Sequence, residues 1–168
     1  SGNQLAVFRN AALLSDEDMR RLAGEVHFSE TAFILSDTPR DGGYDVRVFT
    51  PTEEIPFSGH AVLGAAYVLR HELVDEPVTG MRINLGGGPL EVSFTYHYGS
   101  VDTVWVNQRP AEFGATLQRE TAAALLGLAE ADIDERWPVQ EVSTGLPFIV
   151  VPLRSLSAVR RSRVDADE

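Results

Sequence analysis

The sequence of 168 residues contains no cysteine, which excludes a disulfide framework, a thiolate nucleophile and a cysteine-ligated zinc site. Positive charge is scarce, because 14 Lys and Arg residues face 25 Asp and Glu residues. The resulting net charge of −11 opposes binding to nucleic acid and to anionic membrane surfaces. Apolar runs such as residues 149–153 are far below the roughly 20 residues of a membrane-spanning helix. We therefore expect a soluble protein, with the cytoplasm as its default location.

The residues that are present favour a folded domain that mixes helices and strands. Hydrophobic side chains make up 43% of the sequence, which is enough to form a buried core. The spacing of apolar residues and the position of capping residues predict helices over residues 15–26, 59–71, 116–126 and 155–163. Apolar and alternating runs predict strands over residues 5–8, 32–35, 44–49, 81–85, 90–98, 101–106 and 147–153. The chain begins with Ser and enters its first strand almost at once, which suggests that residues precede it.

The order of these elements predicts the architecture. The strands at 32–35 and 44–49 should form a hairpin, and the three strands between residues 81 and 106 should form an antiparallel meander. The helix over residues 59–71 is apolar most of the way round, which predicts burial inside a wrapped sheet. Because strands and helices do not alternate regularly, as they do in a doubly wound fold, the sequence predicts an α+β fold.

The most informative local feature is Phe57-Ser58-Gly59-His60, which opens the apolar helix. Free backbone N–H groups and the helix dipole attract anions to a helix start. Gly59 would let a ligand approach the backbone closely, and His60 would add a group that exchanges protons near neutral pH. The alternative is that Ser58 only caps the helix and that His60 is an ordinary surface or core histidine.

A second candidate is Glu30, which lies in Ser29-Glu30-Thr31 between Phe28 and Phe33. A carboxyl group held among aromatic rings loses hydration, which would suit it to accept and donate a proton near pH 7. The alternative is an ordinary solvated loop residue.

Other polar clusters give no sign of a cofactor. The acidic residues at 16–18, 53–54 and 130–135 are expected to be helix-end and surface charges rather than a metal site. The glycines at 86–88 lie between strands and lack the ending of a phosphate loop, and residues 59–64 do not match the dinucleotide fingerprint. We therefore predict no metal and no nicotinamide or flavin cofactor.

Three stretches of sequence are weak signals singly but form a specific pattern together. They are GNQLAVF at residues 2–8, FSETAF at 28–33, and the run at 46–66 that contains VRVFTP, EIPFSGH and LGAA. A further stretch, STGLPF, follows at residues 143–148. In their order and spacing these motifs resemble the phenazine biosynthesis PhzF-like family.

The resemblance implies a diaminopimelate epimerase-like fold, in which two lobes each wrap antiparallel strands around a central helix. The active site would lie in the cleft between the lobes, and family members are isomerases without a metal or an organic cofactor. Matching the motifs gives Glu30 the role of acid and base, and it places Gly59 and His60 at the substrate, with His60 assisting catalysis. The remaining predicted substrate contacts are Asn3, Ser29 and Ser58. The expected reaction is a proton shift on a small carboxylate in secondary metabolism, such as phenazine biosynthesis.

Two features of the family are missing from the sequence. They are the strand before the Gly-Asn motif and the second-lobe motif, an acidic pair followed by Ala-Thr-Gly-Ser. We therefore interpret residues 1–142 as the first lobe without its first strand, and residues 143–168 as the start of the second lobe or a crossover segment. A second polypeptide is expected to carry the complementary lobe and to place its acidic motif opposite Glu30; a homo-oligomer is the less favoured partner. The functional alternatives are a non-catalytic binding or accessory module, and an epimerase or C–C hydrolase of the same family.

Overall fold

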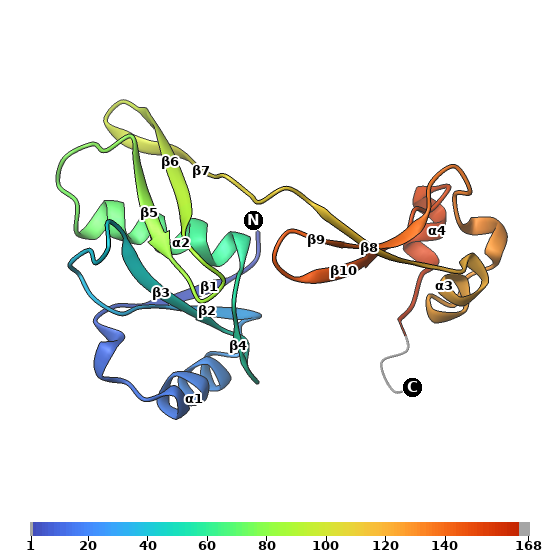
Figure 1. The fold of residues 1–168 in the computed structure, drawn as a ribbon, viewed down its shortest axis with the longest axis horizontal. Coiled ribbons are helices and arrows are strands. Elements are labelled where there is room, and N and C mark those ends of the chain that lie inside the picture. Colours follow the sequence, from blue (N-terminus) through green and yellow to red (C-terminus); the bar gives the residue numbers. More distant parts are fainter. Residues whose placement is uncertain (1, 165–168) are drawn as a thin grey trace. The chain divides into compact units, whose positions relative to one another are not determined.

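The computed structural model describes residues 2–164, and the chain divides after Gln108 into unit 1 and unit 2 (Figure 1). The elements of unit 1 are β1 (Leu5–Phe8), η1 (Ala11–Leu13), α1 (Asp16–Val26), β2 (Glu30–Ile34), β3 (Tyr44–Phe49), β4 (Glu54–Ile55), α2 (Gly59–Glu72), β5 (Gly80–Asn84), β6 (Leu90–His97) and β7 (Ser100–Val106). Those of unit 2 are β8 (Glu112–Leu117), α3 (Arg119–Leu125), η2 (Glu130–Asp132), β9 (Val139–Ser143), β10 (Pro147–Val150) and α4 (Leu156–Arg161). The predicted division into lobes after residue 142 stays a prediction, and part of the second segment, residues 165–168, lies outside the described residues.

The described strands of unit 1 form a seven-stranded sheet in the order β1-β2-β3-β5-β6-β7, with β4 paired to β3. The pairs β1–β2 and β3–β5 are parallel, and the other pairs are antiparallel. This confirms the predicted hairpin of β2 and β3 and the predicted meander of β5, β6 and β7. Figure 1 shows the sheet curling around α2, which contacts strands from β1 to β7. The predicted α+β fold with a helix inside a wrapped sheet is confirmed.

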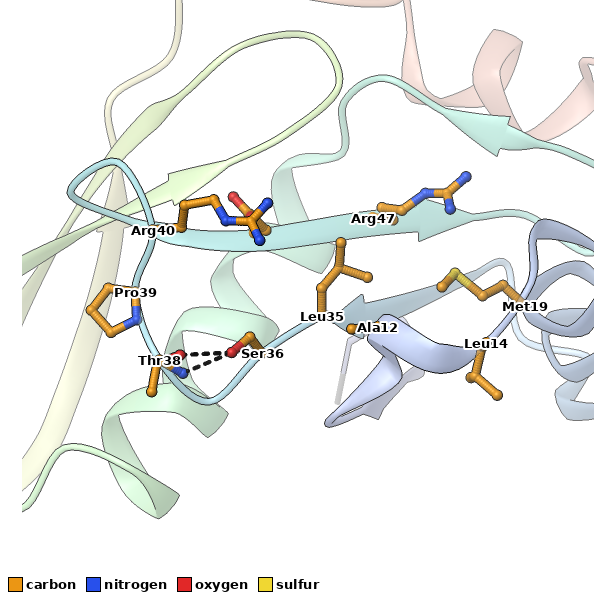
Figure 2. Close-up of a pocket in the computed structure, with 10 residues that line it drawn as sticks. Ala12, Leu14, Met19, Leu35, Ser36, Thr38, Pro39, Arg40 and Arg47 are labelled. Carbon is orange, nitrogen blue, oxygen red and sulfur yellow. Dashed lines mark hydrogen bonds and ion pairs between the residues drawn. The ribbon is translucent and has the colours of Figure 1, made fainter.

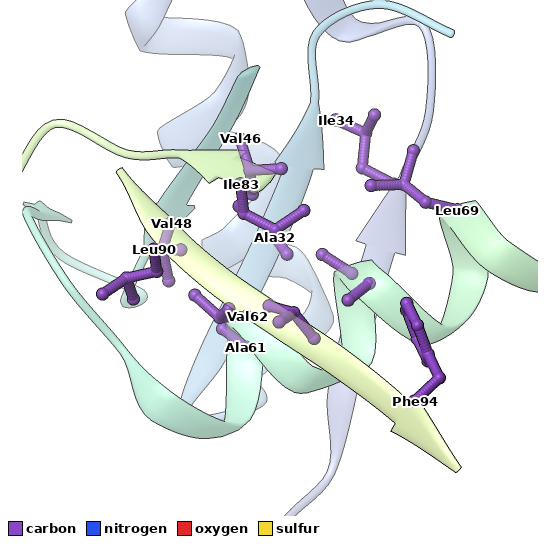
Figure 3. Packing of buried hydrophobic residues seen from close by; sticks show 13 residues of the cluster. Ala32, Ile34, Val46, Val48, Ala61, Val62, Leu69, Ile83, Leu90 and Phe94 are labelled. Carbon is purple, nitrogen blue, oxygen red and sulfur yellow. The ribbon is translucent and has the colours of Figure 1, made fainter. Parts of the chain in front are cut away.

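Helix α2 is buried because it carries small and branched apolar side chains on most of its surface. Ala61, Val62 and Leu69 are fully buried and pack against side chains from β2, β3, β5 and β6 (Figure 3). A Cβ atom at Gly64 would collide with the side chain of Leu5 on β1, so glycine permits this close approach of helix and strand. Burial of each large apolar side chain contributes roughly 1.5–3 kcal/mol. The start of α2 is therefore held in a fixed place.

The other face of β2 packs against α1. Ser15 and Asp18 form a capping box that starts α1 where the sequence predicts it. Phe33 stacks on Phe8 with ring centroids 5.2 Å apart, and it meets Phe49 edge-on. The other fully buried members of this second core are Ala11, Met19 and Ala23. Strand β2 therefore lies between two cores, one under α1 and one around α2.

The described strands of unit 2 form an antiparallel sheet in the order β10-β9-β8. The helix predicted over residues 116–126 is wrong at its start, because Thr116 and Leu117 pair with Gln140 and Val139 as part of β8, and α3 begins only at Arg119. Strand β9 was not predicted, since its sequence Val-Gln-Glu-Val-Ser is short and does not alternate apolar and polar residues. The predicted strand over 147–153 ends at Val150, and the predicted helix over 155–163 is found as α4. None of the helices described in residues 2–164 combines the length and the hydropathy that a bilayer crossing requires.

Candidate active site

Two of the motifs singled out in the sequence meet where β2 and α2 both begin. Glu30 is the first residue of β2, and Gly59 is the first residue of α2. Side chains alternate along a strand, so Glu30 shares its face of β2 with Ala32 and Ile34, which belong to the core around α2. This alternation turns the Glu30 carboxyl group toward the helix start.

At this point Glu30, Ser58 and His60 form a hydrogen-bonded cluster. The Ser58 hydroxyl donates to Glu30 Oε2. The Nδ1 atom of His60 lies 3.3 Å from the same carboxyl oxygen and 3.4 Å from Ser58 Oγ. The side chain of Glu30 is 19% exposed and that of His60 is 34% exposed, so both are shielded but open to a small molecule. We refer to these residues as the Glu30 cluster.

The aromatic surroundings expected for Glu30 are wrong on one side. Phe33 lies three residues along β2, so it points to the opposite face of the strand and packs with Phe8 and Phe49. Phe28 precedes the strand and is half-buried. The carboxyl group is therefore surrounded mainly by a hydroxyl and an imidazole.

The start of α2 supplies free hydrogen-bond donors next to this cluster. Ser58 Oγ accepts the N–H of Ala61, and the Ser58 carbonyl accepts the N–H of Val62. The geometry of an α-helix leaves the N–H groups of Gly59 and His60 without an intrahelical acceptor. These two groups and the helix dipole suit the carboxylate of a ligand.

Gln108 is a neighbour of the site that the sequence did not reveal. A Cβ atom on Gly59 would lie 3.3 Å from the Gln108 side-chain nitrogen. Gln108 follows β7, a strand that contacts α2. In the sequence it belongs to a polar run after a strand and shows no motif, so only the wrapping of β7 around α2 could have identified it.

The predicted contacts Asn3 and Ser29 also come together. Asn3 Nδ2 donates to Ser29 Oγ over 2.6 Å, and both residues are exposed. They meet because β1 and β2 run parallel, with Leu5 opposite Glu30. Ser29 directly precedes Glu30 in the chain. The contact of Asn3 and Ser29 with substrate stays a prediction.

Residues of the acidic clusters form ion pairs, as surface charges commonly do, and one of these residues is buried. Asp16 pairs with Arg47 over 2.7 Å. Asp134 is only 7% exposed, which corrects its predicted surface position, and it pairs with Arg136 over 2.6 Å. Hydrogen bonds from the side chain and backbone of Arg136 lower the pKa of Asp134 to about 2. Within residues 2–164 no three His, Asp or Glu side chains are placed to hold a metal ion.

A hollow of about 460 Å³ lies in another part of unit 1, between η1, α1 and β3 (Figure 2). Its two arginines are already paired, Arg47 with Asp16 and Glu54, and Arg40 with Asp45. The Glu30 cluster does not line this hollow. Its lining residues are Ala12, Leu14, Met19, Leu35, Ser36, Thr38, Pro39, Arg40, Asp45 and Arg47.

A sheet wrapped around a buried helix, with a carboxyl group beside the start of that helix, gives unit 1 the α+β architecture that was expected for a diaminopimelate epimerase-like lobe. Comparison with known proteins makes this specific. The family model described as phenazine biosynthesis-like protein matches residues 1–168. The chain therefore belongs to the phenazine biosynthesis-like (PhzC-PhzF) family.

Relatives and solved structures agree with this membership. An uncharacterized isomerase of Clostridium acetobutylicum is 32% identical over 174 residues, which cover 99% of this chain and 56% of the relative. The structure of a predicted epimerase from Pseudomonas aeruginosa matches with a TM-score of 0.87 and 32% identity, over 99% of this chain and 59% of that one. A PhzF-family protein from Bacillus anthracis matches with a TM-score of 0.83 and 28% identity, over 98% and 55%. The chain thus spans about half the length of the curated relatives it matches.

Proposed function

We propose that this chain provides the acid–base centre of a cofactor-independent isomerase that shifts a proton on a small carboxylate. The observation that carries the proposal is the Glu30 carboxyl group, held by Ser58 and His60 beside the donors at the start of α2. The names of the relatives, isomerase and predicted epimerase, support the reaction class.

The arrangement suggests a simple sequence of steps. The substrate carboxylate accepts hydrogen bonds from the N–H groups of Gly59 and His60. Glu30 then removes a proton from a carbon atom of the substrate, and the electron pair of the broken C–H bond moves into the neighbouring unsaturated system. The protonated Glu30 returns the proton to another carbon, which forms a new C–H bond and leaves an isomer. No electrons are gained or lost, so the reaction needs no redox partner.

The finer parts of this function are also proposals. We expect a metabolite of secondary metabolism, of the kind that phenazine biosynthesis handles, and a cytoplasmic location. An epimerase would return the proton to the same carbon from the other side. A C–C hydrolase would consume water and release two products. Product analysis distinguishes these reactions.

The key test replaces Glu30 with Gln, which keeps the shape of the side chain but removes its acid–base chemistry. The protein is purified with whatever accompanies it, and small amino, hydroxy and unsaturated ring carboxylates are incubated with it in heavy water and followed by NMR. We expect the rate of deuterium incorporation to fall by about 100-fold or more. Glu91→Gln, at an exposed position on β6, is the matched control and should keep the wild-type rate. A wild-type rate in Glu30→Gln would remove the assigned role, and binding without exchange in the wild type would favour an accessory module.

The complementary lobe is the partner that we propose for unit 2. One face of its sheet carries Phe113, Val142 and Phe148 in one cross-strand row, and both phenylalanines are at least 66% exposed. An apolar groove of about 270 Å³ on this face also includes Trp137 and Val150. Apolar patches of this kind on protein surfaces commonly mark an interface. Because the curated relatives are almost twice as long, the lobe that they add supplies the natural occupant.

Intact-mass analysis of the native complex tests this partner. We expect a second polypeptide that carries the acidic Ala-Thr-Gly-Ser motif. Phe113→Ser should release it, whereas Tyr98→Ser, at a residue that is 95% exposed in unit 1, should not. A monomer of 18.4 kDa without apolar dye binding would contradict the proposal. A complex of two identical chains would show that the partner is a second copy of this chain and not a complementary lobe.

A further inference from the structure

Ser58 makes a contact that the other capping serines do not make. Ser15 and Ser155 also cap helices by accepting the N–H of the residue three positions along. The Ser15 hydroxyl then donates to Asp18 within its own helix. The Ser58 hydroxyl instead donates to Glu30, 28 residues away on β2. We propose that Ser58 is a positioning residue that holds Oε2 of Glu30 and leaves Oε1 to exchange the proton with substrate.

The count of protons at Ser58 supports this role. A hydroxyl group has one proton to donate. Its oxygen already accepts the N–H of Ala61 at 3.3 Å, so the hydroxyl proton is available for a second group. The Ser58 oxygen lies closer to Glu30 Oε2 than to His60 Nδ1, so Glu30 receives this proton. Because Ser58 is only 5% exposed, water has little access to compete for this bond.

The imidazole of His60 places a second donor group near the same carboxyl oxygen. Its Nε2 atom is buried, and no hydrogen-bond partner for it lies in the part of the chain that the structure describes. A buried N–H without an acceptor is costly, so the proton of the neutral ring belongs on Nδ1. Nδ1 lies 3.3 Å from Glu30 Oε2 and 3.4 Å from Ser58 Oγ, so its proton faces the pair that these two groups form. Both donor groups therefore lie beside Oε2.

The rigidity of α2 makes this hold effective. Ser58 is fixed to the helix by its capping bond, and the helix is fixed by the core around it. A glutamate side chain without such a hold would sample several rotamers, and only some of them aim at the substrate. Displacement of a reacting group by about 1 Å can lower a rate by about 100-fold.

Ser58→Gly tests the proposal, because glycine is an acceptable helix cap but has no hydroxyl. This inference rests on the proposed function, so one of the two readouts uses no substrate. The first is the rate of deuterium incorporation into the reacting carboxylate, which we expect to fall by about 10- to 100-fold with little change in KM. Ser58→Thr keeps a hydroxyl and should restore most of the rate. Ser15→Gly, which changes a cap far from Glu30, should leave the rate unchanged.

The second readout is the ring ¹⁵N signal of His60 in histidine-labelled protein. We expect the wild type and Ser15→Gly to show the Nδ1–H form with the signal of an N–H group beside a carboxylate, and we expect the Nδ1 signal to shift in Ser58→Gly because Glu30 is no longer held there. An unchanged His60 signal in Ser58→Gly overturns the proposal, and so does a changed signal with a wild-type rate. A third outcome separates the two proposals. If the wild type incorporates no deuterium into any carboxylate but the His60 signal still changes in Ser58→Gly, the proposed isomerase function is wrong and the positioning role of Ser58 stands.

Discussion

The two units cover their sheets in different ways. In unit 1 strand β2 is packed on both faces, by α1 through Phe33 and by α2 through Ile34. In unit 2 one face of the sheet packs under α3 through Val139, while the other exposes Phe113 and Phe148. Because β2 is packed on both faces, its side chains keep fixed directions. This suits unit 1 to the acid–base chemistry that we propose for Glu30. An apolar face left open serves association, which is the role we propose for unit 2.

The largest expected effect contrasts a buried and an exposed phenylalanine. Phe33→Ala removes a fully buried ring between Phe8 and Phe49, and it should lower the free energy of unfolding of unit 1 by about 3–5 kcal/mol. Phe113→Ala removes a ring that is 70% exposed, and it should change the stability of unit 2 in the isolated chain by less than about 0.5 kcal/mol. Urea unfolding followed by backbone amide signals from each unit measures both. Equal effects would mean that the two phenylalanines do not differ in packing as described.

A smaller effect concerns the acid sensitivity of unit 2. The pKa of Asp134 is lowered from 3.8 to about 2 by its hydrogen bonds with Arg136. The folded unit therefore binds this proton less readily than the unfolded chain, and the ion pair stabilises it fully above about pH 4. That contribution should be lost as the pH falls from about 4 to about 2. In Asp134→Asn this part of the pH dependence should be absent from urea unfolding of unit 2, and an unchanged pH profile would exclude the ion pair as its source.

The parts of the fold with strong local signals could be predicted from the sequence. The capping box at Ser15 located α1, and the apolar run from Gly59 located a helix that its own composition marks as buried. Strand β3 was predicted with its observed bounds, because Tyr44–Phe49 alternates clearly. In unit 2 the same approach misplaced the start of α3 and missed β9, since both depend on pairing between segments far apart in the sequence.

The candidate site shows the same division. The motifs around Glu30 and His60 were visible in the sequence, and the structure brings these two residues together. The face on which Phe33 lies depended on where β2 begins, and the place of Gln108 depended on how β7 wraps around α2. The contact between Ser58 and Glu30 spans two elements, and no local pattern in the sequence reports it.

The central claim is that small carboxylates bind at the start of α2, beside Glu30. Titration of the ¹⁵N-labelled chain with benzoate, a small ring carboxylate, tests it through the backbone amide signals. The account predicts that the signals of Gly59 and His60 shift together with the side-chain amide of Gln108, and that Glu91→Gln leaves these shifts unchanged. Shifts confined to the hollow beside Arg40 and Arg47, with none at Gly59 and His60, would contradict it.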